Sequence, residues 1–229
     1  MREPVPDFAG DLVRYLDLDP RSENFETRSR IINGAFDELR ELIYDEDYDR
    51  IIIAGHSLGS VIAHDALNRV IQSMNAGVLD EKKAAKIIGL VTFGSPLDKI
   101  ALFFREHVDS SREVQRQVLS DLHGFRARPI EAKPDTNRQI HFKMSSPIKN
   151  PMNNIRWLNF HHKKDLVSGR LDLYLLDGQK FQHLKPDGNI LIKKDVPRLA
   201  AHGCYWGSHL GEKKGTDQMQ KTIVAEFFG

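Results

Sequence analysis

The apolar positions of the chain follow two periods, one typical of helices and the other of buried strands. Residues 24–44 and 59–75 carry apolar side chains at every third or fourth position, which predicts two amphipathic helices, and residues 216–228 have the pattern of a closing helix. The first stripe contains Ile32, Ala35, Phe36, Leu39, Leu42 and Ile43, and the second contains Ile62, Ala63, Ala66, Leu67, Val70 and Ile71. Each stripe marks the helix face that we expect to pack on a core.

Three short runs have the pattern of central strands. Arg50–Ala54, Ile87–Phe93 and Arg156–Phe160 are apolar on both faces or nearly so, as in parallel sheets that helices cover on both sides. The first two runs enclose a helix, which predicts a right-handed strand–helix–strand unit. Turn signals within residues 171–194 predict short antiparallel strands. The expected fold class is α/β, with a short, mostly parallel sheet flanked by helices.

The composition is that of an ordinary folded domain. The chain has 229 residues, 40% of them hydrophobic, and its 33 basic and 32 acidic side chains leave a formal charge of +1. This balance argues against a surface dedicated to nucleic acid or to anionic membranes. Cys204 is the single cysteine, so an internal disulfide and a cysteine-rich zinc module are both excluded.

The first residues do not have the pattern of a secretory signal. Prolines and early acidic residues stand where a signal has a basic start and an apolar run. The longest apolar stretches, such as Ile87–Phe93, are far shorter than the ~20 residues that cross a membrane. We expect a protein without an integral membrane segment that is located in the cytoplasm.

The length favours a single domain over residues 1–229. Residues 98–125 have a polar-faced helical pattern, and residues 126–154 contain four prolines and read as a loop. We expect residues 98–154 to form a cap or insert over the site. An apolar cap would favour acyl or lipid-like substrates, but the same side chains could equally fill a small core.

The strongest chemical signal is Gly55-His56-Ser57-Leu58-Gly59, which matches G-x-S-x-G between an apolar strand and an amphipathic helix. This context predicts a nucleophile elbow, in which a sharp turn holds Ser57 in a strained conformation above the sheet edge. The two glycines are expected to leave room for the adjacent strand and helix. The Leu58 N–H, at the start of the helix, is the expected oxyanion donor.

A nucleophilic serine needs a base, and the base needs an acid that orients it. With the chain order Ser, acid, His, the acid should follow a later strand, which favours Asp165 with Asp172 as the alternative. The base should lie between the last strand and the last helix, where His202 and His209 are the candidates. Small neighbours at Ala201 and Gly203 favour His202.

Four segments together resemble the lipase/esterase-type serine hydrolases of the α/β-hydrolase superfamily. These segments are GHSLGSVIAHDAL, VTFGSPLDKI, WLNFHHKKDLVSG and AHGCYW. The resemblance implies an α/β-hydrolase-like fold and a carboxylic ester hydrolase that works through an acyl-enzyme. It assigns the nucleophile to Ser57, the acid to Asp165 and the base to His202, with Leu58 at the oxyanion hole. It implies a small-molecule or lipid-like ester substrate and neither cofactor nor metal.

The chain departs from that family in having only 50 residues before Ile51. These residues read as helix and loop, so the early strands of the fold are lacking, together with the loop that normally supplies the second oxyanion N–H. Either the chain is a fragment or a shortened relative, or another backbone group substitutes. The missing strands would also expose an apolar sheet edge unless the N-terminal helices cover it.

Two other classes compete with an esterase. A non-catalytic or scaffold protein of the same fold, having lost part of the oxyanion hole, would keep the elbow for structural reasons. It predicts that Ser57→Ala leaves the biological role intact, and a Ser57–His202–Asp165 chain beyond hydrogen-bond reach would favour it. A metal hydrolase would use His161, His162, Asp165 and another histidine. Adjacent histidines on a strand point to opposite faces, and no H-E-x-x-H motif is present, which disfavours a metal site.

Overall fold

A computed structural model describes most of the chain outside the region predicted as a cap. The described residues are 4–15, 17, 19–100, 155–172, 185–205 and 214–229. Of the predicted cap at 98–154, residues 101–154 lie outside this set. The cap and the single-domain organisation therefore stay predictions.

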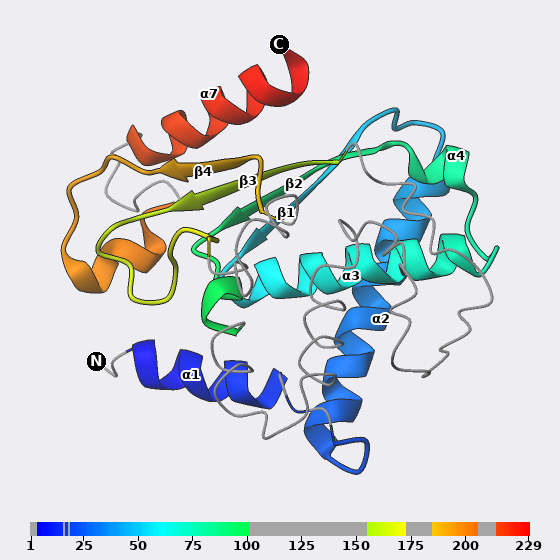
Figure 1. Cartoon of the computed structure of the whole chain (residues 1–229), viewed down its shortest axis with the longest axis horizontal. Coiled ribbons are helices and arrows are strands. Elements are labelled where there is room, and N and C mark those ends of the chain that lie inside the picture. Colours follow the sequence, from blue (N-terminus) through cyan, green and yellow to red (C-terminus); the bar gives the residue numbers. More distant parts are fainter. Residues whose placement is uncertain (1–3, 16, 18, 101–154, 173–184, 206–213) are drawn as a thin grey trace, which may run out of the picture.

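The described sheet has four strands in the order β1-β2-β3-β4, and each neighbouring pair is parallel. The strands are β1 (Ile51–His56), β2 (Ile87–Phe93), β3 (Arg156–His161) and β4 (Gly188–Leu191). Helices lie on both faces of the sheet (Figure 1). The predicted α/β fold class is confirmed, and the three central strands fall within two residues of their predicted bounds.

The prediction of antiparallel strands near the C-terminal end is wrong for β4, which pairs parallel with β3. The parallel pairing is explained by Asp187, a residue that the sequence pattern places in a turn. The Asp187 carboxylate accepts a hydrogen bond from the Trp157 N–H (2.7 Å), and the Asp187 N–H donates to the Trp157 carbonyl (2.8 Å). The Pro-Asp-Gly signal thus fastens the start of a parallel strand to β3. The other turn signal lies outside the described residues.

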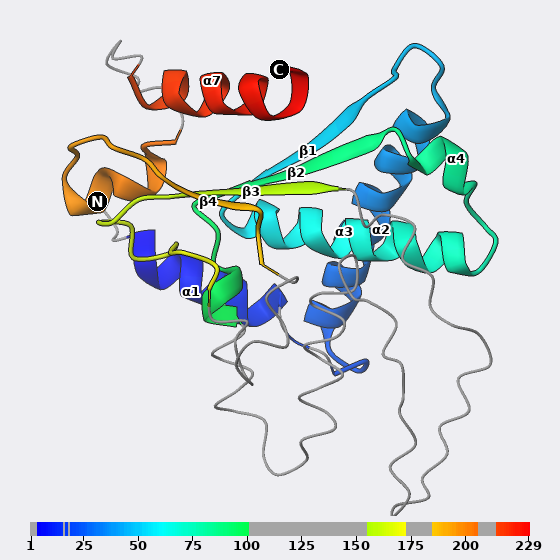
Figure 2. The same ribbon diagram turned by 45° about the horizontal axis from the view of Figure 1, so that its top comes forward.

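The helices form a layer on each side of the sheet. They are α1 (Pro4–Tyr15), α2 (Glu23–Tyr44), α3 (Leu58–Asn75), the short α4 (Glu81–Ala84), the 3-10 helix η3 (Arg198–Gly203) and α7 (Lys214–Phe228). One face is covered by α3, with α2 packed on the far side of α3, and α7 lies over the other face (Figure 2). The predicted stripes supply buried residues on α2 and α3.

Each face of the sheet has its own apolar core. The core under α3 contains Leu67, Val70, Leu90 and Trp157, and the core on the α7 side contains Val91, Phe93, Leu158 and Phe160. On the α7 side, a side chain at Gly89 would overlap the Phe227 ring, because a Cβ there would lie 2.1 Å from a ring carbon. The glycine lets α7 approach the middle of β2.

Among the described strands, β1 has a neighbour on one side only and forms an edge of the sheet. The predicted concern about this edge is partly borne out, because Ala54 is exposed and Ile52 and Ile53 are only half-buried. The helix α2 packs chiefly on α3, one layer away from the strand (Figure 2).

A partly buried polar cluster joins the two N-terminal helices to α3. The Asp65 carboxylate on α3 accepts hydrogen bonds from the Tyr15 hydroxyl of α1 (2.9 Å) and from the Arg28 guanidinium of α2 (3.0 Å). The Arg28 guanidinium also lies over the Tyr15 ring at 5.3 Å. Burial alone would raise the pKa of Asp65, but His64, Arg28 and Tyr15 outweigh it and hold the pKa below its usual value. The carboxylate stays ionised in place.

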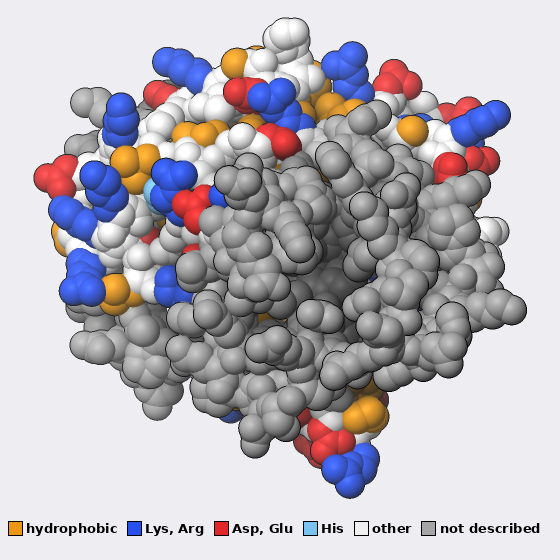
Figure 3. Space-filling view, viewed as in Figure 1, with side chains coloured by type: hydrophobic (Ala, Val, Ile, Leu, Met, Phe, Trp, Pro, Cys, Tyr) orange, Lys and Arg blue, Asp and Glu red, His pale blue; other side chains and the backbone are white. Residues whose placement is uncertain are grey.

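The distribution of surface charge and the apolar character of the helices match what the composition predicts. On the face shown in Figure 3, basic and acidic side chains of described residues are interspersed around the rim. Within the described part of the chain, none of the helices has the length and apolar character needed to cross a membrane.

Candidate active site

The predicted elbow lies between the end of β1 and the start of α3. Ser57 occupies the turn with φ 53° and ψ −129°, and among the described residues it alone has positive φ without being glycine. A Cβ at Gly55 would lie 2.5 Å from the Gly59 carbonyl oxygen and 2.6 Å from the Ser60 Cα. Only glycine therefore allows the helix start to press against the strand end, which is the steric condition expected of an elbow.

The steric argument does not extend to the second glycine of the motif. A Cβ at Gly59 would have no described heavy atom within 4 Å, so close packing does not require glycine at this position. The expectation that both glycines make room is supported at Gly55 alone.

The backbone of Ser57 is tied to the second strand and to the following helix. Its N–H donates to the Phe93 carbonyl (3.1 Å), and its carbonyl accepts from both the N–H (2.9 Å) and the hydroxyl (2.6 Å) of Ser60. The Ser95 hydroxyl lies 2.8 Å from that of Ser60, and both serines are fully buried. The Ser60 hydroxyl is thus placed to donate to the Ser57 carbonyl and to the Ser95 Oγ. This relay helps to hold the strained residue.

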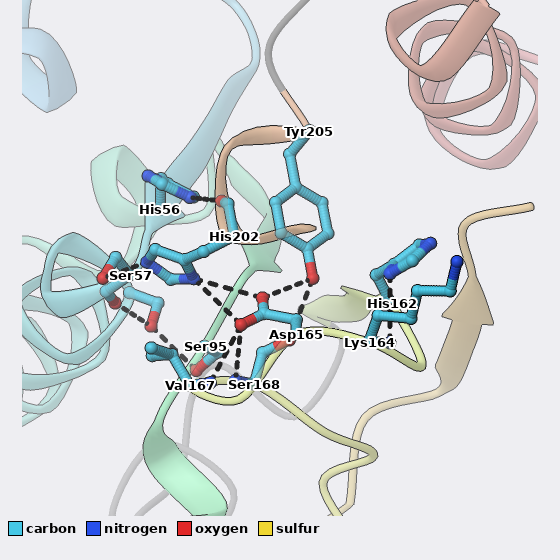
Figure 4. Close-up of polar contacts among 11 residues, drawn as sticks. His56, Ser57, Ser95, His162, Lys164, Asp165, Val167, Ser168, His202 and Tyr205 are labelled. Carbon is cyan, nitrogen blue, oxygen red and sulfur yellow. Dashed lines mark hydrogen bonds and ion pairs between the residues drawn. The ribbon is translucent and has the colours of Figure 1, made fainter. Parts of the chain in front are cut away.

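His202 reaches the serine from the 3-10 helix η3, 145 residues further along the chain. Its Nε2 lies 2.9 Å from the Ser57 Oγ, and its Nδ1 lies 3.1 Å and 3.2 Å from the two carboxylate oxygens of Asp165 (Figure 4). A carboxylate only accepts hydrogen bonds, so Nδ1 carries the proton and Nε2 accepts from the serine. The three predicted side chains are brought together in one hydrogen-bonded chain.

Asp165 lies in the loop after β3 and is buried. Besides His202, it accepts hydrogen bonds from the Val167 N–H (2.9 Å), the Ser168 N–H (3.3 Å) and the Tyr205 hydroxyl (2.9 Å). Burial alone would raise the pKa of Asp165, but the His202 ring, followed by Val167 and Ser168, holds it well below its usual range. The carboxylate is therefore ionised in the folded protein near neutral pH.

Tyr205 links the acid to the loop on its other side. Its hydroxyl is 2.9 Å from both the Asp165 carboxylate and the Ser168 hydroxyl, and the ring is fully buried. Burial, together with the charge of Asp165, raises the pKa of Tyr205. The phenol thus stays protonated and donates to Asp165, while Ser168 donates to the phenol.

A buried amide on β3 anchors the loop that carries Asp165. The Asn159 Nδ2 donates to the Gly169 carbonyl (3.1 Å) and to the Asn189 side chain on β4 (2.9 Å). The Asn159 oxygen accepts from the Thr92 hydroxyl on β2 (3.0 Å), which in turn accepts from the Trp157 indole N–H (3.0 Å). Three strands thereby fix the far end of the loop.

The other sequence candidates lie elsewhere. Asp172 pairs with Arg170 and Asn189, and the described contacts do not bring it to His202. His162 hydrogen-bonds the Lys194 carbonyl through Nε2 (2.7 Å) and the Lys164 N–H through Nδ1 (3.1 Å). Within the described ranges, no group of three or more His, Cys, Asp or Glu side chains could hold a metal ion. His209 lies outside the described residues.

The predicted oxyanion donor begins the helix α3. Leu58 is the first residue of α3, and N–H groups in the first turn of a helix have no acceptor within the helix. Residues 4–15 and 23–44, where an early strand and its loop would stand, are helical. The source of a second oxyanion N–H therefore stays open between the alternatives stated for the sequence, a fragment or shortened relative and a substitute backbone group.

The sequence pattern did not single out four residues that support this geometry. They are His56, Ser60, Asn159 and Tyr205. His56 lies within the G-x-S-x-G motif, and Tyr205 lies in the AHGCYW segment three residues after His202. Their positions alone could therefore have identified these two residues as part of the site. Asn159 is part of the Trp-x-Asn strand in WLNFHHKKDLVSG, which contributes to the family resemblance but does not specify the partners of the amide. Ser60 carries no signal of its own, since a lone polar residue in a helix has many structural roles.

A parallel sheet between helices, with a strained serine at a strand–helix turn, defines an α/β fold of the hydrolase type. Comparison with known families agrees: residues 21–121 match the model of the family described as Lipase (class 3), a lipase family of the α/β-hydrolase superfamily. The predicted resemblance to lipase/esterase-type hydrolases is confirmed, and the match indicates lipase-type action on esters. The matched range contains Ser57 and ends before Asp165 and His202. No curated protein and no solved structure matches the chain.

Proposed function

We propose that this protein is a serine hydrolase of carboxylic esters that works through Ser57, His202 and Asp165 and an acyl-enzyme intermediate. The observation that carries the proposal is the unbroken chain of contacts, 2.9 Å from the Ser57 Oγ to the His202 Nε2 and 3.1 Å from the His202 Nδ1 to Asp165. The family match over residues 21–121 supports the ester as substrate class.

In the first half of the reaction, the Ser57 Oγ attacks the ester carbonyl carbon while its proton passes to the His202 Nε2. The carbonyl oxygen becomes an oxyanion, and the Leu58 N–H at the start of α3 donates to it. The tetrahedral intermediate then collapses. The bond to the alcohol oxygen breaks, and His202 returns the proton to the leaving alcohol, which leaves an acyl group on Ser57.

In the second half, water takes the place of the alcohol. His202 accepts a proton from water as the water oxygen bonds to the acyl carbon, and it then protonates the Ser57 Oγ as the acyl bond breaks. The products are a carboxylic acid and the free serine. In both halves, the ionised Asp165 holds the proton on His202 Nδ1 and stabilises the imidazolium.

A fluorophosphonate probe and a series of p-nitrophenyl esters of increasing chain length test the proposal. We expect the probe to label wild type, and Ser57→Ala to lose both labelling and turnover, by about 10⁶-fold in turnover if the residues act as a unit. Ser73→Ala, on the same helix and away from the site, serves as the matched control and should behave as wild type. Folded wild type that takes no label would refute the proposal.

The geometry lacks the feature that would favour the non-catalytic alternative. That feature is a separation of the three side chains beyond hydrogen-bond reach, whereas the distances within the set are 2.9–3.2 Å. The described contacts therefore favour the hydrolase, and the labelling experiment separates the two directly.

A further inference from the structure

His56, the variable residue of the G-x-S-x-G motif, contacts the segment that carries the candidate base. Its Nε2 lies 3.0 Å from the backbone carbonyl oxygen of His202, across 146 residues of sequence (Figure 4). A carbonyl oxygen only accepts hydrogen bonds, so the His56 Nε2 carries a proton and donates it. The residue directly before the nucleophile is thus tied to the backbone of the residue that would serve as its base.

The imidazole of His56 is held in a fitted slot. It stacks on the Phe93 ring, with centroids 5.2 Å apart, and lies 4.8 Å from the His202 ring and 5.8 Å from the Tyr205 ring. Gly94 forms another wall, because a Cβ there would lie 3.0 Å from both Cδ2 and Nε2 of His56. The ring therefore has little freedom to turn, and its donor keeps a fixed direction.

The segment that presents His202 is short. The helix η3 spans six residues, and backbone hydrogen bonds at its two ends join the Ala200 N–H to the Pro197 carbonyl and the Cys204 N–H to the Ala201 carbonyl. A base on such a segment needs an external restraint if its distance to the serine is to stay fixed. The His56 contact supplies that restraint from the last residue of β1, directly before Ser57.

We infer that His56 is a positioning residue, which fixes the distance between His202 and Ser57 through its hydrogen bond to the His202 carbonyl. This inference rests on the proposed function. It assigns to the motif histidine a role that an ordinary turn residue would not have. The charge of the ring fits this role, since a neutral His56 does not oppose the positive charge that His202 acquires during the reaction.

Two variants of similar size separate the hydrogen bond from packing. His56→Gln keeps an N–H donor near the position of Nε2, and His56→Leu keeps apolar volume without a donor. Because a misplacement of 1 Å can cost about 10²-fold in rate, we expect His56→Leu to lower kcat by about that factor, with KM unchanged within about twofold. His56→Gln should recover to within about tenfold of wild type. Both variants should unfold cooperatively, which thermal unfolding checks.

Nitrogen-15 NMR of the histidine rings provides a readout that does not depend on activity. In wild type at pH 7.5, the His56 ring should carry its proton on Nε2. A ring protonated on Nδ1 alone overturns the inference even if the enzyme is active. Equal kcat values for the two variants, with fluorophosphonate labelling of wild type, overturn the inference and leave the proposed function standing. Folded wild type without labelling overturns both.

Discussion

Tyr205→Phe removes one hydroxyl from beneath the candidate acid and leaves the shape of the ring unchanged. That hydroxyl makes two hydrogen bonds of 2.9 Å, donating to the Asp165 carboxylate and accepting from the Ser168 hydroxyl. All three side chains are buried, with exposed fractions of 1%, 6% and 5% for Tyr205, Asp165 and Ser168. Solvent therefore cannot readily replace what the substitution removes.

The magnitude follows from these two bonds. A hydrogen bond to a charged group contributes about 1.5–3 kcal/mol, and a buried hydroxyl left without an acceptor costs about 1–3 kcal/mol. We expect Tyr205→Phe to lower the free energy of unfolding by about 3–4 kcal/mol at pH 7. Asp165 keeps its donors from Val167, Ser168 and His202, so it stays ionised at this pH. The loss in kcat should therefore be less than about tenfold.

Urea unfolding at pH 7 measures this loss, and the double variant Ser168→Ala/Tyr205→Phe provides the control. Because the double variant no longer leaves the Ser168 hydroxyl without an acceptor, it should be more stable than Tyr205→Phe alone by about 1 kcal/mol. The effect should also shrink as the pH falls below the ordinary carboxyl value of 3.8, because the depressed pKa of Asp165 stabilises the fold only while Asp165 is ionised. A loss below about 0.5 kcal/mol at pH 7 would refute the assigned hydrogen bonds.

Three further outcomes are expected. Asp65→Asn should lower the free energy of unfolding by about 1.5–3 kcal/mol in urea titrations, because it removes the carboxylate that accepts from the partly buried Arg28 guanidinium. Gly55→Ala should destabilise the fold by more than about 2 kcal/mol in thermal unfolding, because its Cβ meets backbone atoms at 2.5–2.7 Å, whereas Gly59→Ala should be neutral or stabilising. Burial lowers the pKa of His56 from its ordinary 6.5. The unfolded chain therefore takes up a proton near pH 6.5 before the folded protein does, and stability should fall below this pH by up to about 1.4 kcal/mol per unit. Urea unfolding between pH 5.5 and 7.5 should show a shallower slope for His56→Gln.

The elbow and the central strands could be predicted because their signals are local. The runs at residues 51–54 and 87–93 are apolar on both faces. Gly55 is required by close contacts with the backbone of Gly59 and Ser60, which lie within five residues of it in the sequence. A strand–turn–helix of this kind depends on few long-range partners. The pattern of residue types therefore contains most of the information that the local structure uses.

The direction of β4 could not be predicted because it depends on a contact between distant segments. Asp187 stands in a run typical of turns, and only the Trp157 backbone, 30 residues earlier, makes it the start of a parallel strand. The same limit applies to Asn159, whose amide joins Gly169 and Asn189. Hydrogen bonds of this kind require particular distances between strands, and the order of residue types does not specify them.

The geometry of the sheet explains why the candidate triad is complete although the described sheet has only four strands. Parallel strands end at a common edge, and there β1 leads to Ser57, β2 to the Gly94–Ser95 turn and β3 to the loop of Asp165. Three consecutive strands thus lead to the candidate nucleophile, its backbone support and the candidate acid, and η3 adds the candidate base. A second oxyanion donor is the part of the chemistry that a strand beyond β1 would provide. Proton transfer and oxyanion stabilisation therefore place different demands on the fold. The candidate proton-transfer chain needs only β1, β2, β3 and η3. Full stabilisation of the oxyanion needs a further N–H near the Leu58 end of α3.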